Sequence, residues 1–374
     1  MKINQLDLFS GIGGFHLGFE RAGYKVTSFF SEIDKHAIAV YKHQFPKSTY
    51  VGSVTDVRGG DLPRIDLITF GSPCQDFSLA GKRKGMEGER SSLILEAIRL
   101  IGECRPRVFI WENVKGTFSS NSGEDFAAII QEFTNIGGYR LEWQLLNTSW
   151  FLPQNRERIY LVGYSTTTKR NWRGVFPIGE GSKLLNSEKW DTSQQSKGKR
   201  DKNSLARTLN SRAAFGRGSD DTFIAVTDRK GNELNKEVAP CLTSGPNNGG
   251  NHSDTAWLHI KSATSQGYEE ATEGDSINFS FPNSKTRKGR VGKQKANTLE
   301  TSCNQAVVDD YRIRRLTPIE CERLQGFPDN HTAFGIYDDQ QKPMSNTQRY
   351  KQCGNAVTVD VVQAVAEQCK PLFK

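Results

Sequence analysis

The chain has 374 residues, with 50 Lys and Arg against 42 Asp and Glu, and a formal charge of +8 at pH 7. Its 36% hydrophobic residues allow a buried core, and a mean hydropathy of −0.59 argues against a membrane-spanning or collagen-like protein. Seven scattered cysteines without a C-x-x-C pair argue against a disulfide framework and a thiolate zinc site. The N-terminus lacks an apolar stretch followed by a small-residue cleavage site, so we expect a cytoplasmic protein.

Through about residue 165, short apolar and β-branched runs alternate with amphipathic stretches, as in a parallel sheet covered by helices. The segment from Ser91 to Cys104 reads as a capped helix, with Ile94, Ala97 and Ile101 on one face. This half of the chain predicts a doubly wound α/β fold. The strands that we expect are Ile3–Phe9, Lys25–Ser31, Ile65–Phe70, Arg107–Trp111 and Arg158–Gly163.

A glycine cluster follows the first expected strand, in the stretch Asp7-Leu-Phe-Ser-Gly-Ile-Gly-Gly-Phe15. Glycines between a strand and an amphipathic helix let the backbone approach a nucleotide-like ligand. The second strand leads into Glu32, 21 residues after Gly11, where a carboxylate can accept hydrogen bonds from ribose hydroxyls. Together the two features indicate a ribose-bearing cofactor. The alternative is an ordinary tight turn beside a surface glutamate.

Cys74 lies in the stretch Gly71-Ser-Pro-Cys-Gln-Asp-Phe-Ser78, directly after an apolar strand. This position is the carboxyl edge of the sheet, where open α/β folds bind ligands, and it suits a nucleophile. A free thiol is only slightly ionised at neutral pH, so it needs nearby N–H groups, positive charge or a proton acceptor. The alternative is an inert buried thiol.

The next expected strand leads into Glu112-Asn-Val, which puts a carboxylate at the same sheet edge as Cys74. A carboxylate in this place is costly unless it is paired or used. A glutamic acid beside a thiolate would suit addition to a nitrogen heterocycle, because it can donate to a ring nitrogen while sulfur adds to carbon. A capping or ion-paired Glu112 is the alternative.

The stretch Gln154-Asn-Arg-Glu-Arg158 comes just before the last strand expected in this half. Its two arginines stand at i and i+2, so in an extended segment Arg156 and Arg158 face the same side. They predict an arginine fork for a phosphate or a pyrimidine carbonyl, or else a solvated pair.

From about residue 166 to 310, Gly, Ser, Asn, Thr, Lys and Arg dominate and apolar periodicity fades, which predicts a separate domain or a large insertion. Residues 197–202 and 285–295 are strongly basic and fit either solvated loops or a polyanion-binding patch. Three similar stretches begin at Ala206, Ala239 and Ala296. We prefer short β segments feeding Ser/Thr-rich turns over a recurrent phosphate-binding loop.

Regular patterns return after residue 310. Thr317-Pro-Ile-Glu320 predicts a helix that begins with a capping box and a proline in its first turn. A final helix over about residues 357–369 packs back on the first half of the chain. Its apolar stripe consists of Val357, Val361, Val365 and Cys369.

The chain resembles the DNA (cytosine-5) methyltransferases over about residues 3–165 and 310–370. The matching motifs are DLFSGIGGF at 7–15, Glu32, GSPCQDFS at 71–78, ENV at 112–114, QNRER at 154–158, RRLTPIECERLQGFP at 314–328 and YKQCGNAV at 350–357. The resemblance implies an α/β fold with the Rossmann-like sheet of S-adenosylmethionine-dependent methyltransferases. It implies a catalytic and cofactor-binding domain (1–165), an inserted, mostly irregular and β target-recognition domain (166–310), and a C-terminal segment completing the catalytic domain (311–374).

The resemblance further implies methylation of C5 of cytosine in a short specific double-stranded DNA sequence, without a metal. Cys74 would add to C6 of a cytosine flipped out of the duplex, and Glu112 would hold N3 and the exocyclic amine. Arg156 and Arg158 would steady the base and the active-site loop. The implied S-adenosylmethionine pocket consists of Phe9, Gly11, Ile12, Gly13, Gly14, Glu32, Ile33, Ser53, Val54, Pro73, Leu93, Asn355 and Ala356.

One stretch departs from the family pattern. The family usually has Gly-Asp in the loop after the third strand, and that Asp meets the adenine amino group. This chain reads Val51-Gly-Ser-Val-Thr-Asp56 at the same place. Either Ser53 substitutes more weakly, or Asp56 reaches the adenine from a shifted loop.

We expect a monomer in the cytoplasm of a bacterial or phage-infected cell, with double-stranded DNA as partner and no membrane. The sequence leaves open whether a separately acting restriction endonuclease accompanies the enzyme or whether the enzyme is a solitary modifier. A tRNA methyltransferase is disfavoured by the long basic insert, and a silent DNA-binding module by the intact Cys74, Glu112 and Arg158. A nicotinamide-dependent oxidoreductase leaves the Pro-Cys-Gln and Glu-Asn-Val motifs unexplained.

Overall fold

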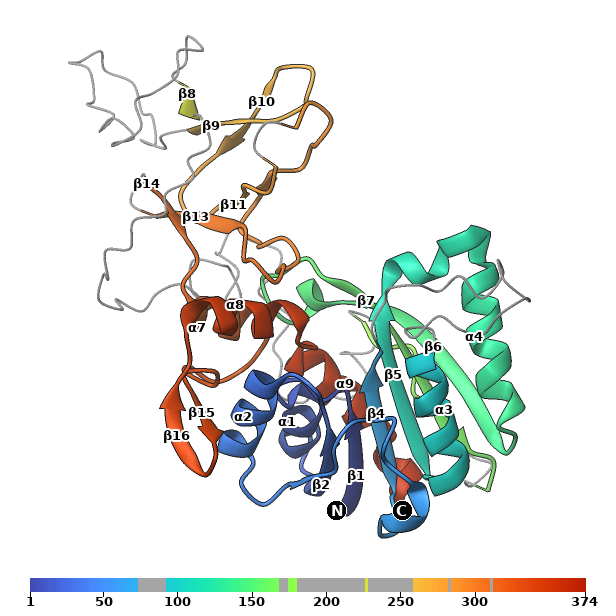
Figure 1. The fold of residues 1–374 in the computed structure, drawn as a ribbon. Coiled ribbons are helices and arrows are strands. Elements are labelled where there is room, and N and C mark those ends of the chain that lie inside the picture. The colour runs from blue at the N-terminus through green and yellow to red at the C-terminus, as the bar shows by residue number, and fades with distance from the viewer. Residues whose placement is uncertain (73–91, 168–173, 180–225, 228–257, 282–283, 310–311) are drawn as a thin grey trace, which may run out of the picture.

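The computed structural model describes residues 1–72, 92–167, 174–179, 226–227, 258–281, 284–309 and 312–374. Within them, a seven-stranded sheet forms the centre of the larger part of the molecule (Figure 1). Its strands in spatial order are β3 (Thr49–Tyr50), β2 (Lys25–Ser31), β1 (Lys2–Leu8), β4 (Leu67–Gly71), β5 (Val108–Val114), β7 (Glu157–Ser165) and β6 (Tyr139–Asn147). The first five are parallel, and β7 lies antiparallel between β5 and β6. The predicted α/β fold is confirmed.

Helices cover both faces of this sheet. The first face carries α1 (Gly14–Arg21), α2 (Lys35–Gln44) and α9 (Val359–Cys369), and the second carries α3 (Ser92–Cys104) and α4 (Glu124–Asn135). Side chains alternate between the two cores along each strand, because successive residues of a strand point to opposite faces. In β4, for example, Leu67 belongs to the first core and Ile68 to the second.

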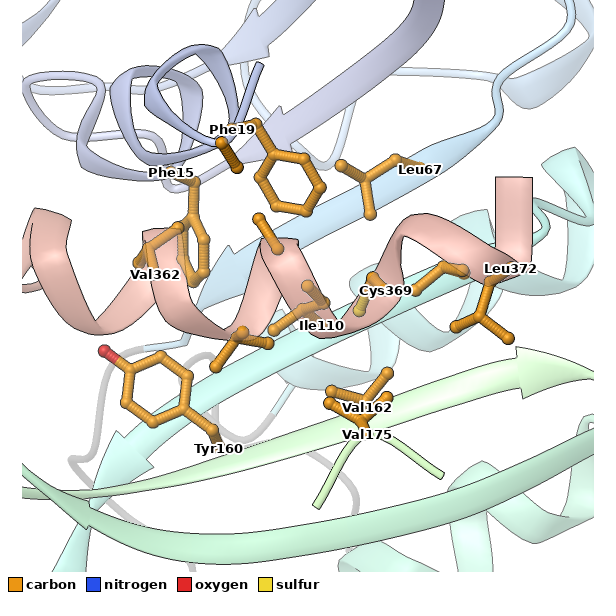
Figure 2. Packing of buried hydrophobic residues seen from close by; sticks show 14 of the residues in the cluster. Phe15, Phe19, Leu67, Ile110, Tyr160, Val162, Val175, Val362, Cys369 and Leu372 are labelled. Atoms are coloured by element: carbon orange, nitrogen blue, oxygen red, sulfur yellow. The ribbon is translucent and has the colours of Figure 1, made fainter. Parts of the chain in front are cut away.

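The final helix packs beside α1 on the first face of the sheet (Figure 2), in line with the prediction that it packs on the first half of the chain. Gly18 permits this packing, because a Cβ there would lie 2.4 Å from Cγ1 of Val362. The Tyr24 hydroxyl donates to the carbonyl of Ala366 at 2.9 Å. The helix begins at Val359 rather than at Val357, with Thr358 as its N-cap residue.

The strands differ from the predicted ones mainly at their ends. β2 has the predicted bounds, whereas β5 continues to Val114, so Glu112 lies inside the strand rather than after it. β7 runs from Glu157 to Ser165, slightly longer at both ends than the predicted Arg158–Gly163. The sequence did not predict β3 and β6. β3 has two residues, and most side chains of the edge strand β6 are half-buried, which blurs its alternation.

The described part of the segment 166–310 contains short strands in two sheets, at the top of the view in Figure 1. One sheet consists of β10 (Tyr268–Ala271), β9 (Leu258–Lys261) and β8 (Val226–Thr227). The other consists of β12 (Val291–Gly292), β11 (Ser276–Asn278), β13 (Gln305–Asp309) and β14 (Arg312–Arg315). They share a small core of Leu258, Ile260, Ala271, Ile277, Ala306 and Val308.

The C-terminal part links the two regions through α7 (Pro318–Leu324), β15 (Phe334–Tyr337), β16 (Gln340–Pro343) and α8 (Asn346–Asn355). The predicted capping box is present, with Glu320 N donating to Thr317 Oγ1 at 3.3 Å and Thr317 N to Glu320 Oε2 at 2.7 Å. Short 3₁₀ helices are η1 (Gly59–Asp61), η2 (Lys115–Phe118), η3 (Ser120–Gly123), η4 (Thr148–Trp150) and η5 (Lys370–Phe373). Among the described helices, none is both long and apolar enough to span a membrane.

Candidate functional site

The glycine turn lies between β1 and α1 and exposes its backbone. Phe9, Gly11 and Gly13 all have positive φ, at 50°, 53° and 83°. A Cβ on Gly11 would meet no atom within 4 Å, so the backbone there borders open space. Gly11 N donates to Glu32 Oε2 at 2.9 Å, which ties the turn to the end of β2. The predicted glycine turn and Glu32 are therefore in contact.

The Glu32 carboxylate is held by backbone donors. Its Oε1 accepts from Ile33 N at 2.8 Å and from Asp34 N at 3.0 Å, in addition to the bond from Gly11. A carboxylate has about four acceptor positions, so capacity remains for a ligand hydroxyl. The next side chain, Ile33, is 78% exposed, which is unusual for a large apolar residue next to a sheet. Together these residues form a surface for a ligand with a polar and an apolar part.

The C-terminal segment closes the other side of the turn. A Cβ on Gly14 would lie 2.6 Å from Cγ2 of Val357, so only glycine permits this contact. Ile12 and Ala356 pack in one buried cluster. Burial lowers the pKa of His331 to about 4, so its neutral ring can donate from Nε2 to the Ile12 carbonyl at 2.9 Å.

The two predicted arginines have different partners. Arg156 is buried and donates to the carbonyls of Gly354 at 3.4 Å and Ala356 at 2.9 Å. Arg158 instead lies beside Glu112. Arg156 therefore holds the C-terminal segment close to the strand that carries Arg158. Asn355 lies in this segment and is exposed.

Glu112 lies in β5 opposite Gly71, the last residue of β4, and it is 8% exposed. Arg158 Nε is 3.2 Å from Glu112 Oε1, an ion pair between β7 and β5. This oxygen makes no hydrogen bond with any described residue, because the ion pair lacks hydrogen-bond geometry. The site therefore holds a buried carboxylate with an unused acceptor oxygen beside a guanidinium.

Pro73 and Cys74 lie outside the described residues. The last described residue before them, Ser72, accepts hydrogen bonds from Trp111 Nε1 at 3.0 Å and Asn113 Nδ2 at 3.4 Å. The chain therefore leaves β4 beside the two residues that flank Glu112. After the gap, Leu93 is half-buried in α3 against the second core.

The loop that departs from the family pattern follows β3. Gly52 has a φ of 87°, and its carbonyl accepts from Ser31 Oγ at 2.8 Å, at the end of β2. Val54 is buried in the second core, while Ser53 Oγ lies 2.9 Å from Thr55 Oγ1. Asp56 is exposed and its N–H donates to the Ser53 carbonyl at 2.9 Å.

Sequence reasoning missed a buried polar network beside the glycine turn. Asp7, in β1, is fully buried and accepts from Thr69 Oγ1 at 2.7 Å and from the Tyr41 hydroxyl at 3.4 Å. The same hydroxyl lies 2.8 Å from Ser28 Oγ and 3.1 Å from His16 Nδ1. Burial raises the pKa of Asp7 to about 8. The detectable signal was a charged residue within the apolar strand Ile3–Phe9.

The sheet, the glycine turn and the carboxylate at the end of β2 define a doubly wound α/β protein with an open glycine turn at the carboxyl edge of its strands. The sequence profile of the C-5 cytosine-specific DNA methylase family matches residues 3–371. The chain belongs to this family and is a DNA (cytosine-5) methyltransferase. The predicted family and enzyme class are confirmed.

Two relatives cover nearly the whole chain. The orphan methyltransferase M.SPRI of Bacillus phage SPR is 30% identical, over 98% of this chain and 97% of its own. The type II methyltransferase M.Bsp6I of Bacillus sp. (strain RFL6) is also 30% identical, over 96% of each chain. A solved structure of the Dnmt2 methyltransferase of S. pombe has a TM-score of 0.58 at 18% identity and covers 100% of both chains, which supports the fold.

Proposed function

We propose that the enzyme takes its methyl group from S-adenosylmethionine, bound at the glycine turn. The open space at Gly11, the spare acceptor capacity of Glu32 and the exposed Ile33 fit a ligand with a ribose and a purine. Glu32 would hold the ribose and Ile33 the adenine, while Phe9 and Asn355 would border the rest. When bound, this cofactor supplies a methyl group on a sulfonium, an electrophile that the C5 carbon of cytosine can accept.

We infer that Cys74 activates the cytosine by covalent addition. Its thiolate adds to C6 and pushes an electron pair toward C5 and N3, and the Glu112 carboxyl group delivers the proton that N3 takes up. After C5 has accepted the methyl group, C5 loses its proton to a base and expels the sulfur. N3 returns its proton to Glu112, which restores the aromatic ring and the enzyme.

Base flipping follows from the burial of Glu112. A carboxylate that is 8% exposed at a sheet edge is beyond the reach of a cytosine stacked inside a duplex. Enzymes that act on such a base bring it out of the stack into a pocket. The observation that carries the proposal is the place of this buried carboxylate. Glu112 pairs in register with Gly71, at the end of the strand that leads to Cys74. One of its oxygens lacks a hydrogen-bond partner among the described residues.

We assign sequence recognition to residues 166–310 and catalysis to residues 1–165 together with 311–374. The strongly basic stretch 285–295 supports this division, because phosphate contacts supply much of the affinity for DNA. The stretch from Ala296 also joins the two parts, since Asn155 N donates to the Ala296 carbonyl at 2.7 Å and Leu299 N to Gln154 Oε1 at 3.0 Å.

The proposal is tested by mapping 5-methylcytosine at base resolution in plasmid DNA from a methylation-free host that expresses the protein. We expect methylation at one short motif, and its loss in the Cys74→Ser variant, because an alcohol is a far weaker nucleophile than a thiolate. Cys104→Ser, at the end of α3, is the matched control and should keep the activity.

Each outcome bears on a different part of the proposal. Undiminished methylation by Cys74→Ser would refute the covalent step. Soluble wild-type protein that leaves plasmid DNA unmethylated would refute DNA as the substrate and direct the same mapping to tRNA. Methylation that does not depend on added S-adenosylmethionine in a purified reaction would refute the cofactor.

A further inference from the structure

Phe281 is an exposed aromatic residue on the loop after β11. Its side chain is 74% exposed, and its φ of 51° is in the left-handed region that favours glycine. A large apolar side chain gains nothing for folding when it stays in water, and a left-handed φ costs about 1 kcal/mol for a residue with a Cβ. The exposed ring at this position is therefore available for contact with a partner.

Buried donors hold the backbone of Phe281 in place. Arg290 is 1% exposed, and its guanidinium donates to the carbonyls of Asn278 at 3.2 Å, Ser280 at 3.1 Å and Phe281 at 2.6 Å. Ser280 Oγ donates to Glu300 Oε2 at 3.0 Å on the far side of the loop. These hydrogen bonds fix the backbone from which the Phe281 ring extends.

Positive charges without partners lie in the same loop. Lys285 and Lys288 are exposed and make no ion pair with any residue in the described ranges, in contrast to Lys293, which pairs with Asp275 at 2.9 Å. Arg287, in contrast, pairs with Glu300 at 3.7 Å, and its guanidinium carbon is 5.7 Å from the centroid of the Phe281 ring. Between residues 276 and 299 the sequence has six Lys or Arg and no Asp or Glu.

We propose that Phe281, Lys285 and Lys288 form a DNA-contacting patch, in which the ring packs against bases of the substrate duplex and the two lysines bind its phosphates. An aromatic ring beside unpaired cations suits a nucleic acid, because bases offer flat apolar surfaces and phosphates offer negative charge. A lone ring is small for a protein interface, which needs a larger apolar area. The inference rests on the DNA-methylating activity and adds the residues that engage the DNA.

The test measures DNA binding and methylation by Phe281→Ala, Phe281→Gly and Phe281→Tyr. We expect Phe281→Ala to raise the dissociation constant and the KM for duplex DNA about fivefold or more, with the KM for S-adenosylmethionine unchanged. Phe281→Gly removes the strain of the left-handed φ and keeps the carbonyl that Arg290 binds. If this variant binds DNA more weakly at an unchanged Tm, the loss is due to the missing ring. Phe281→Tyr should bind DNA nearly as well as the wild type.

The lysines are tested through salt. Lys285→Ala/Lys288→Ala should reduce the slope of log K against log salt concentration by about 1.8, the value for two lost phosphate contacts.

Phe334→Ala is the matched control for Phe281→Ala, because Phe334 is 40% exposed on β15, far from this loop (Figure 1). Binding within twofold of the wild type by both Phe281→Ala and Phe281→Gly overturns the inference. A wild type that binds DNA through Phe281 but does not methylate it would instead overturn the proposed function.

Discussion

The sheet region and the smaller sheets of residues 258–315 are built in different ways. The seven-stranded sheet has a large apolar core on each face, whereas the smaller sheets share a core of six side chains. The smaller sheets depend instead on charged side chains that are hydrogen-bonded to the backbone, of which the half-buried Glu269 is an example. Its carboxylate accepts from the backbone N–H groups of Gly289 at 2.8 Å, Arg290 at 3.2 Å and Val291 at 3.0 Å.

Asp275 plays a similar part on the neighbouring turn. It is 1% exposed and accepts from Thr272 N at 2.9 Å, Gln294 N at 3.0 Å and Lys293 Nζ at 2.9 Å. A few buried polar side chains can fix a loop without a large apolar core, provided that each is hydrogen-bonded. This construction fixes the backbone of the loops without depending on their outer side chains.

The largest effect is expected at Glu112, a buried carboxylate of the sheet region with an oxygen that makes no hydrogen bond to the described residues. Glu112→Gln keeps the size of the side chain but removes the proton that N3 needs. We expect kcat to fall by about 10²- to 10⁴-fold, with the affinity for S-adenosylmethionine unchanged.

Glu269→Gln is the matched control for a carboxylate that serves structure. It should lower the stability of the smaller sheets and leave the rate of the chemical step on bound DNA nearly unchanged. Turnover by Glu112→Gln at the wild-type rate, measured in a single-turnover experiment, would contradict the assigned role.

A smaller effect is expected at Arg290, where the smaller sheets depend on one buried guanidinium. Arg290→Met leaves three carbonyls without their donor, which should cost about 3 kcal/mol of local stability. Hydrogen exchange should then accelerate across residues 258–309 and stay slow in β1, β4 and β5. Arg287→Met, in the same loop, should have little effect on exchange. Equal acceleration in both regions would show that they unfold as one unit.

A pH-dependent effect is expected at Asp7, the buried carboxyl beside the glycine turn. Its pKa is about 8 in the folded protein because of burial, and about 3.9 in an unfolded chain. Its contribution to stability is therefore fully present below about pH 4 and is lost as the pH rises to about 8. Asp7→Asn should make the free energy of unfolding less dependent on pH between these values.

The measurement is denaturant unfolding at several pH values. Asp61→Asn, an exposed carboxylate in η1, should retain the pH dependence of the wild type. Parallel curves for Asp7→Asn and the wild type would contradict a neutral Asp7.

The strands of the sheet were predictable where they are buried on both faces, because their apolar runs are continuous. β4 is an example, since its buried residues 67–70 lie within the predicted strand Ile65–Phe70. β2 is only partly buried and was nevertheless predicted with its observed bounds. The position of β7 between β5 and β6 was not, since pairing between distant segments depends on their packing rather than on the local pattern. Glu112 also lies within β5 because Glu112–Val114 continue to pair with β7.

The contact between Gly11 and Glu32 was predictable from spacing, since both lie at the carboxyl ends of neighbouring parallel strands. The partners of Arg156 were not. Arg156 precedes β7, so the alternation that governs a strand does not yet apply, and its guanidinium donates to residues about 200 positions further along the chain. The Asp7 network joins five elements through single side chains, which leaves no periodic signal in the sequence.

The contact between the first and last helices has a consequence for synthesis. The carbonyl of Ala366 that binds the Tyr24 hydroxyl emerges 342 residues after its partner. A ribosome that adds roughly 5–20 residues per second needs about 17–70 s for this interval. Throughout that time the N-terminal helix of the nascent chain lacks the surface that buries it, and Gly14 lacks its contact with Val357. The growing polypeptide thus completes its glycine turn only after the segment that contains Val357 and Ala366 has been translated.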